Sequence, residues 1–280
     1  MFFKVFKLNY RIIISFIILI VCFFLFFHST FAVDDYVKVP IVMYHSILKD
    51  TSKSGKYTIT PSLLEEDFKY LKENNYSPIF MQDLINYVYE NVNLPENPII
   101  ISFDDGYYNN YEYVLPLLQK YNFKAVISIV GEYTDKYSTS NEANPNYGYM
   151  RWCDINSAID SNYIEFQNHS YSMHSGNGSM KKYSENFDTY KNRFKTDTLK
   201  LQDEFKNNTN YIPSTYTYPF GGISKGTTEI LKELGFKASL SCTSGINYIS
   251  KNSDCLFCLK RNNRPNNIST EAFFKKFKEK

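Results

Sequence analysis

Two adjacent carboxylates, Asp104 and Asp105, stand between a short apolar run and a glycine. The run at residues 99–103 is bounded by Pro98 and Gly106, which is typical of a buried strand. Like charges this close are costly in a partly buried site unless a metal ion, a cation or a shared proton compensates them. Asp is also common in turns before Gly, so a solvated turn is the plain alternative.

Three histidines can decide between these alternatives. His169 and His174 lie five residues apart after a predicted strand, and His45 ends another. A lone loop histidine is usually a surface or packing residue, but two imidazoles and one carboxylate form the three-ligand pattern of catalytic zinc. The set Asp105, His169 and His174 therefore predicts a divalent metal site. Asp104 would remain as a general base near the water that the ion activates by lowering its pKa to ~7.

The elements that must position these residues alternate between strand and helix. Residues 131–149 are polar and are expected to form a long surface loop. Predicted strands cover 37–44, 99–103, 125–130, 163–167, 215–218, 238–240 and 256–259. Predicted helices begin at residue 60 and cover 81–90, 111–121, 152–161, 183–207, 229–234 and 269–280.

This alternation predicts an α/β fold with a mainly parallel sheet. About seven such units in ~250 residues favour a distorted (β/α) barrel forming a single catalytic domain. The carboxyl ends of barrel strands share one rim. His45, the Asp104–Asp105 pair, His169 and Pro219 all follow predicted strands, so we expect them to converge there.

The N-terminal segment has the pattern of an export signal. Lys4, Lys7 and Arg11 precede an apolar run at residues 12–27, and Thr30-x-Ala32 offers a small-residue cleavage site. The 16-residue run is short for a membrane span, which needs ~20 residues, but retention as an anchor stays open.

We therefore expect residues 1–32 to be a signal peptide or N-terminal membrane anchor and residues 33–280 to be the catalytic domain. The domain would then be exported, extracellular or at the cell surface. A formal net charge of +2 argues against a nucleic-acid binder, which normally has a clustered basic face.

Four cysteines lie outside the N-terminal segment: Cys153, Cys242, Cys255 and Cys258. They permit disulfides in three connectivities. Cys255-x-x-Cys258 could be a redox or zinc motif, but a second cysteine pair or a nearby histidine is missing from the sequence around it. The favoured interpretation is structural, as buried thiols or one disulfide.

Three motifs in this order carry a resemblance to a known family. Phe-Asp-Asp-Gly at 103–106, His-Ser…His at 169–174 and Tyr-Pro-Phe-Gly at 218–221 resemble the polysaccharide deacetylases of carbohydrate esterase family four, the NodB-like domain. The likeness covers roughly residues 39–260. It implies removal of N-acetyl groups from an extracellular amino-sugar polysaccharide by a metal-dependent hydrolase.

The resemblance also implies roles for single residues. Asp104 matches the general base, and Asp105, His169 and His174 match the metal ligands. The backbone amide of Phe220 matches a donor of the oxyanion hole, where such a donor is typically worth ~3–4 kcal/mol.

Further residues are placed at the substrate by the same resemblance. Pro219 and Gly221 flank Phe220 within that motif, and are expected beside the substrate. Trp152 matches an aromatic residue that could stack on sugar, although core packing explains it equally well.

The chain departs from most members in two ways. Its metal histidines are five residues apart where most members have four, and it has no histidine after His174. In both respects the chain resembles the exported poly-N-acetylglucosamine deacetylases. Their general acid is the histidine of an N-terminal Met-Tyr-His segment. Met43-Tyr44-His45 matches that segment, which implies His45 as general acid. An inert histidine at a barrel mouth is the alternative, and Asp154 and Asp254 are only guesses for its carboxylate partner.

Several functional alternatives stay open. The chain could be a cell-surface carbohydrate-binding protein that lacks turnover, or Cys255-x-x-Cys258 could support a redox activity. The substrate could be poly-N-acetylglucosamine, peptidoglycan or a chitin-like oligomer. We expect the protein to work at the cell envelope or membrane surface. Zn is the expected metal, while Co, Ni and Fe also suit two imidazoles and a carboxylate. The oligomeric state is open.

Overall fold

The computed structural model describes residues 10–30 and 36–278. The chain divides into two compact units, Met1–Tyr36 and Val37–Lys280. The first unit contains helix α1 (Tyr10–Thr30). Lys4, Lys7 and Ala32 of the predicted export signal lie outside the described residues. Within the described parts of the chain, no helix is both long and apolar enough to qualify as a membrane span.

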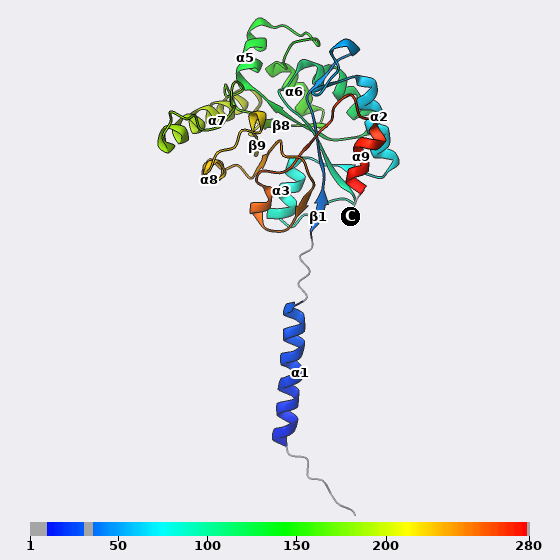
Figure 1. The fold of residues 1–280 in the computed structure, drawn as a ribbon, viewed down its shortest axis with the longest axis vertical. Coiled ribbons are helices and arrows are strands. Elements are labelled where there is room, and N and C mark those ends of the chain that lie inside the picture. The colour runs from blue at the N-terminus through cyan, green and yellow to red at the C-terminus, as the bar shows by residue number, and fades with distance from the viewer. Residues whose placement is uncertain (1–9, 31–35, 279–280) are drawn as a thin grey trace, which may run out of the picture. The chain divides into compact units, whose positions relative to one another are not determined.

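The second unit is built on a mainly parallel sheet (Figure 1). Seven strands follow the order β10-β9-β8-β7-β6-β2-β12, and β5 also pairs with β6, all in parallel. The strands are β2 (Ile41–Tyr44), β5 (Ser77–Pro78), β6 (Pro98–Phe103), β7 (Ala125–Ile129), β8 (Ile164–Asn168), β9 (Thr215–Thr217), β10 (Ala238–Leu240) and β12 (Asn262–Asn263).

One stretch of chain, which we call the closing segment (residues 259–264), connects the two edges of this sheet. Leu259 forms a parallel bridge with Leu240 of β10. Three residues later, β12 pairs with β2 at the other edge, and Arg264 N–H donates to the Met43 carbonyl at 3.0 Å. The sheet is therefore curled, as predicted for a distorted (β/α) barrel.

Helices surround the strands in Figure 1. Two further sheets have two short strands each. Strand β1 (Val37–Val39) pairs with β11 (Asn247–Ile249) in antiparallel orientation, and β3 (Ser46–Ile47) pairs with β4 (Thr58–Ile59) in parallel. The helices are α2 (Pro61–Glu73), α3 (Met81–Tyr89), α4 (Leu115–Tyr121), α5 (Gly131–Ser140), α6 (Trp152–Asp160), α7 (Phe187–Thr209), α8 (Thr227–Glu233) and α9 (Thr270–Lys278), with single turns at Thr51–Lys53, Asn110–Val114, Pro219–Gly221 and Ser253–Leu256.

Strand β6 shows why this sheet holds the site rigidly. All six of its residues are buried. Ile99, Ile101 and Phe103 belong to one apolar cluster, while Ile100 belongs to another, because successive side chains point to opposite faces. Burial on both faces is normal for a parallel strand covered by helices, and each such side chain contributes about 1.5–3 kcal/mol.

The prediction of a surface loop over residues 131–149 is wrong, because Gly131–Ser140 forms helix α5. Its segment is rich in Ser, Thr and Tyr, which are weak helix formers, so local sequence did not reveal it. Tertiary contacts stabilise it instead. The Gly131 and Glu132 amides donate to the Ser170 and Tyr171 carbonyls at 3.1 and 2.8 Å. Asp135 accepts a hydrogen bond from the Tyr171 hydroxyl at 2.8 Å.

Two other local predictions need correction. Residues 256–259 do not form a strand, since Ser253–Leu256 is a helical turn capped by the Asn252 side chain. Helix α7 begins at Phe187 rather than near residue 183, because Asn186 caps it by accepting from the Thr189 amide at 2.8 Å.

The cysteines are all free thiols in the described residues. The prediction of buried thiols or one disulfide for Cys153, Cys242, Cys255 and Cys258 is therefore wrong on both counts, because the four thiols are unpaired, Cys153 is exposed and the other three are only partly buried.

Candidate active site

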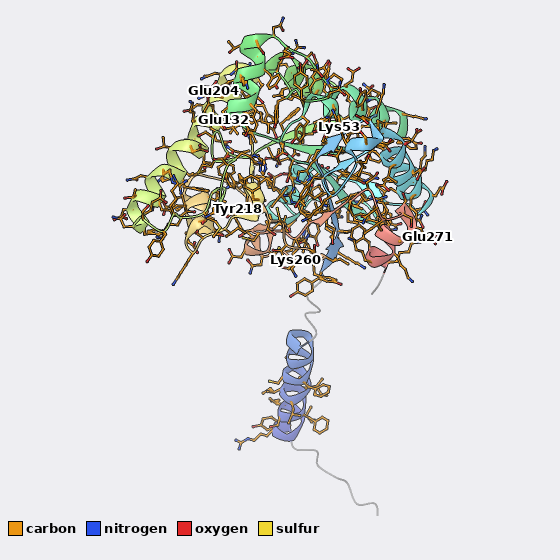
Figure 2. The ribbon with its side chains drawn as sticks, turned by 45° about the horizontal axis from the view of Figure 1, so that its top comes forward. Lys53, Glu132, Glu204, Tyr218, Lys260 and Glu271 are labelled. Atoms are coloured by element: carbon orange, nitrogen blue, oxygen red, sulfur yellow. The ribbon has the colours of Figure 1, made fainter. Side chains whose placement is uncertain are left out.

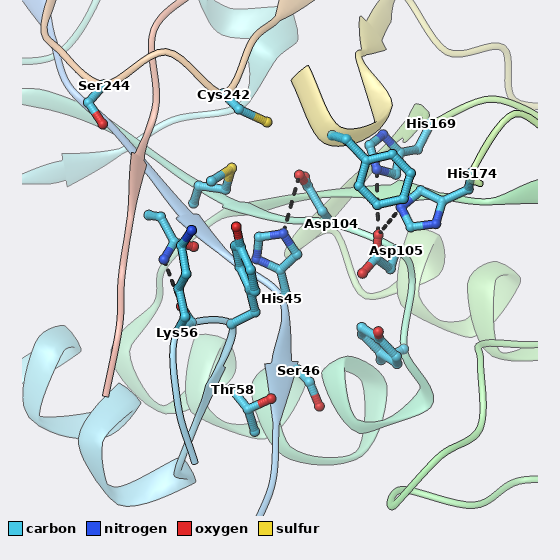
Figure 3. Close-up of a pocket in the computed structure, with 15 residues that line it drawn as sticks. His45, Ser46, Lys56, Thr58, Asp104, Asp105, His169, His174, Cys242 and Ser244 are labelled. Carbon is cyan, nitrogen blue, oxygen red and sulfur yellow. Dashed lines mark hydrogen bonds and ion pairs between the residues drawn. The ribbon is translucent and has the colours of Figure 1, made fainter. Parts of the chain in front are cut away.

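The candidate site is a pocket of about 500 Å³ at the carboxyl ends of β2, β6, β8 and β9 (Figure 3). Five of the predicted reactive side chains line it together. They are Asp104 and Asp105 after β6, His45 after β2, and His169 and His174 after β8. The remaining lining residues are Met43, Ser46, Lys56, Tyr57, Thr58, Tyr107, Phe220, Cys242, Ser244 and Asn263.

The backbone turns sharply at these strand ends. Asp105, Ser170 and Phe220 have φ values of +74°, +69° and +55°, which non-glycine residues rarely adopt. Such conformations cost of order 1–3 kcal/mol and concentrate at functional sites. At Gly106, φ is +72° and an added Cβ would lie 2.7 Å from Cγ2 of Ile129, so the Asp-Asp-Gly turn requires its glycine.

Asp105, His169 and His174 converge on one point. Nε2 of His174 lies 2.9 Å and Nε2 of His169 3.5 Å from Oδ1 of Asp105. That oxygen is buried yet accepts no hydrogen bond of good geometry within the described residues. Burial opposes ionisation of Asp105, but the close imidazoles of His169 and His174 outweigh it and hold the pKa of Asp105 far below its ordinary value.

These three residues fit a divalent cation. Their ligand atoms lie within 4.8 Å of one another, and a tetrahedral ion with bonds of 2.0–2.2 Å needs separations of about 3.3 Å. Nδ1 of His169 is 2.8 Å from the Thr217 carbonyl and donates to it, which leaves Nε2 with a free lone pair facing Asp105. The orphaned oxygen and this tautomer together are what a metal site requires.

Asp104 is held by a residue that the sequence did not reveal. Arg261 of the closing segment donates from Nη1 to Oδ1 at 2.6 Å and from Nη2 to Oδ2 at 2.8 Å. Both side chains are almost fully buried. Burial alone would raise the pKa of Asp104, but Arg261 and His169 outweigh it, and the net pKa is lowered. Asp104 therefore stays ionised and fixed in orientation.

Arg261 left only a faint signal in the sequence. Buried arginines nearly always have an acidic partner, yet nothing local marks Arg261 as buried. It follows the last predicted strand by two residues, and its partner is 157 positions away.

His45 lies next to Asp104 on the wall of the pocket. Its Nε2 lies 3.9 Å from Oδ2 of Asp104, too far for a hydrogen bond, and its buried Nδ1 has no partner in the described part of the chain. The Tyr57 ring packs edge-on against it at 4.8 Å. Burial lowers the pKa of His45, although Asp104 and Asp105 oppose this, so the protonated imidazole is a comparatively strong acid.

Neither guessed carboxylate partner of His45 is near it. Asp154 pairs with Arg151 at the start of α6, with an Nη2 to Oδ1 distance of 2.8 Å. Asp254 pairs with Lys232 at 2.5 Å and is exposed.

The Pro219–Gly221 turn places Phe220 at the pocket. The Gly221 and Gly222 amides are used in turn bonds to the Tyr218 and Pro219 carbonyls, both at 2.9 Å. The Phe220 ring packs on His174 at 4.5 Å and is 58% exposed. Pro219 and Gly221 flank it without lining the cavity.

Trp152 does not line the pocket, which corrects its assignment to substrate binding. It is 8% exposed and its ring packs edge-on against Phe205. Its indole N–H donates to Asp135 at 2.8 Å. The structure therefore favours the packing alternative, and it shows that Trp152 helps to hold α5.

The loop that carries His174 is fastened by Asp197 of α7. Asp197 accepts from the backbone amides of Tyr171 and Ser172, each at 2.8 Å, and from the Ser172 hydroxyl at 2.8 Å. Such indirect support of a metal ligand is typically worth 10- to 100-fold in metal affinity.

We expect Asp197→Ala to weaken zinc binding by about 10- to 100-fold, because the His174 loop loses three hydrogen bonds. Zinc titration against a chromophoric chelator measures this. Asp197→Asn should give a smaller loss, since it keeps one acceptor. Asp203→Ala, at an exposed position of the same helix, is the matched control. Unchanged affinity in Asp197→Ala, or an equal loss in the control, would contradict this role.

Comparison with known proteins bears on this geometry. A family model described as polysaccharide deacetylase matches residues 91–239. The poly-β-1,6-N-acetyl-D-glucosamine N-deacetylase of Escherichia coli K12 is 24% identical over 227 residues, which cover 73% of this chain and 34% of that protein. The chain therefore spans about a third of the length of this curated relative.

Solved structures share the fold. The deacetylase PplD of Streptococcus pyogenes, in complex with acetate, matches with a TM-score of 0.72 and 20% identity, covering 87% of this chain and all (100%) of that one. IcaB from Ammonifex degensii matches with a TM-score of 0.68 and 20% identity, covering 81% of this chain and 92% of that one.

Proposed function

This chain belongs to the polysaccharide deacetylase family, and we propose that it removes N-acetyl groups from an amino-sugar polysaccharide by metal-dependent hydrolysis. One observation carries the proposal. The buried carboxylate of Asp105, one oxygen of which has no hydrogen-bond partner among the described residues, converges with the imidazoles of His169 and His174. The same pocket holds a second carboxylate, Asp104, which Arg261 keeps ionised. A protein that only binds sugar has no need of that unliganded base.

Asp105, His169 and His174 would hold the ion. When bound there, a divalent metal supplies polarisation of the acetamide oxygen and activates water for attack at neutral pH. Asp104 takes a proton during that attack. Arg261 occupies one lone pair on each of its oxygens, and the remaining lone pairs stay available as acceptors.

Collapse of the tetrahedral species needs a proton for the departing amine. His45 lies beside Asp104, with 3.9 Å between Nε2 and Oδ2, and donates it as general acid. The backbone amide of Phe220, on a left-handed turn at the pocket wall, stabilises the developing negative charge on the acetamide oxygen.

We propose poly-β-1,6-N-acetyl-D-glucosamine as substrate, with a peptidoglycan-like polymer as the alternative. The name of the Escherichia coli relative supports the first. We also propose that the domain works outside the cytoplasm at the cell envelope, delivered by the N-terminal segment. The three basic residues, the apolar run and the small-residue site support export.

Acetate release tests the activity. Purified protein should release acetate from β-1,6-linked N-acetylglucosamine oligomers, lose this activity on exhaustive chelation and regain it with stoichiometric zinc. β-1,4-linked oligomers tested in parallel separate the two polymers. Activity that survives complete metal removal would contradict the mechanism.

The alternative of a non-catalytic carbohydrate-binding protein rests on one observation, the unpartnered Nδ1 of His45. It predicts oligomer binding with no acetate release under any added metal. Calorimetric binding measured beside the acetate assay distinguishes the two functions.

A further inference from the structure

The pocket extends well beyond the atoms that the chemistry uses. A cavity of about 500 Å³ is of the size that encloses a drug-sized ligand, far more than one acetamide. One part of its wall carries none of the proposed metal or catalytic groups. The residues of this part, which we call the Lys56 side, are Ser46, Lys56, Tyr57, Thr58, Ser244 and Asn263.

The Lys56 side is fixed in place by backbone hydrogen bonds. Lys56 lies in the turn between β3 and β4, where the Ser46 amide donates to the Tyr57 carbonyl at 3.1 Å. The Asn263 side-chain amide donates to the Lys56 carbonyl at 2.7 Å, which joins this turn to the closing segment. These hydrogen bonds therefore fix the backbone of Lys56 at the pocket, from which its exposed side chain extends.

Lys56 is close to the reaction centre. Its Nζ lies 4.9 Å from the centre of the Tyr57 ring, and that ring packs against His45 at 4.8 Å. In the view of Figure 3, Lys56 lies on one side of His45 and His174 on the other. A sugar next to the reacting unit would therefore meet Lys56.

The positive charge of Lys56 has no acidic counterpart in the pocket. Among the described lining residues, the only acids are Asp104 and Asp105. Arg261 neutralises Asp104, and Asp105 faces the two imidazoles. On the same side, Asn263 adds an uncharged polar residue to the lining.

We propose that the Lys56 side binds the sugar next to the one being deacetylated, and that Lys56 excludes a neighbour whose amine is already free. This inference rests on the proposed deacetylase function. Each reaction turns a neutral acetamide into acetate and an amine that is largely protonated near neutral pH. The cationic product is repelled by Lys56, whereas a neutral N-acetylated neighbour is not. Acetyl groups are then removed at separated units, and deacetylation stops before completion.

Two defined trimers test the inference. One carries three N-acetyl groups, and the other has one free amine beside the reacting unit. At low salt the protein should prefer the first in kcat/KM by roughly three- to tenfold, the size of one screened charge repulsion. Lys56→Met should bring this ratio close to one, and high salt should shrink it in the unaltered protein.

Lys53→Met is the matched control, because Lys53, which is labelled in Figure 2, is an exposed lysine of the same loop. Lys53 does not line the pocket. It should keep the full preference. An unchanged ratio in Lys56→Met, or an equal drop in Lys53→Met, overturns the inference.

Calorimetric affinities separate this inference from the activity itself. The zinc-loaded protein should bind the fully acetylated trimer more tightly than the amine-containing one, and Lys56→Met should lose that preference. If the protein releases no acetate at all, the proposed function fails while the binding preference still tests Lys56. Equal affinities for both trimers in the unaltered protein overturn the inference.

Discussion

Asp104→Asn should lower acetate release by about 10²- to 10⁴-fold while zinc binds with nearly unchanged affinity. The magnitude is that of removing a positioned general base. Asparagine keeps the shape of the side chain but cannot accept the proton. Asp104 is also not one of the three converging ligands, so the ion keeps its site. Steady-state kinetics and zinc titration on the same folded sample measure both effects.

Asp105→Asn provides the contrast. It replaces the carboxylate toward which both imidazoles point, so zinc affinity should fall and activity should fall with it. Excess zinc should restore part of the activity in Asp105→Asn and none in Asp104→Asn. If the two variants lose zinc affinity to the same degree, the assignment of Asp104 as general base and Asp105 as metal ligand is wrong.

Arg261→Met should destabilise the protein by about 3–5 kcal/mol, because it leaves the carboxylate of Asp104 buried without a partner. It should also move the acid limb of the pH–activity profile upward. Arg261 lowers the pKa of Asp104 against the effect of burial, so without it the pKa rises. The ionised base is then lost at a higher pH as the solution is acidified. Chemical denaturation and a pH–kcat/KM profile measure the two effects.

Arg264→Met is the matched control for Arg261→Met. Arg264 lies in the same closing segment, is equally buried and pairs with Asp67 at 2.8 Å, away from the pocket. It should cost comparable stability and leave the pH profile in place. The double variant Asp104→Asn/Arg261→Met should lose less stability than the sum of its parts. Additive losses, or the same pH shift in Arg264→Met, would contradict direct coupling of Arg261 to Asp104.

The sequence predicted the parts of the fold that depend on local pattern. Strand β6 reads as an apolar run between proline and glycine, and its end delivers Asp104 and Asp105 to the rim that the barrel prediction required. His45, His169 and His174 were found because histidine is rare in this chain and each follows a strand. Their meeting in one pocket follows from the parallel order of the sheet.

The remainder depends on contacts that no local pattern encodes. Helix α5 forms from weak helix formers because its first amides and Asp135 bond to a distant loop. The partner of Asp104 is an arginine 157 residues later, brought there only by the closing segment. Trp152 looked equally suited to sugar or core, and only its burial against Phe205 decided between them.

Anomalous diffraction from crystals grown with one equivalent of zinc tests whether Asp105, His169 and His174 hold a metal ion. We expect a single strong peak about 2.0–2.2 Å from a carboxylate oxygen of Asp105 and from Nε2 of His169 and His174. Asp104 and His45, whose Oδ2 and Nε2 are 3.9 Å apart, should then both lie close to the open coordination position. A peak at Cys255 and Cys258, or none at the three ligands, would contradict this assignment.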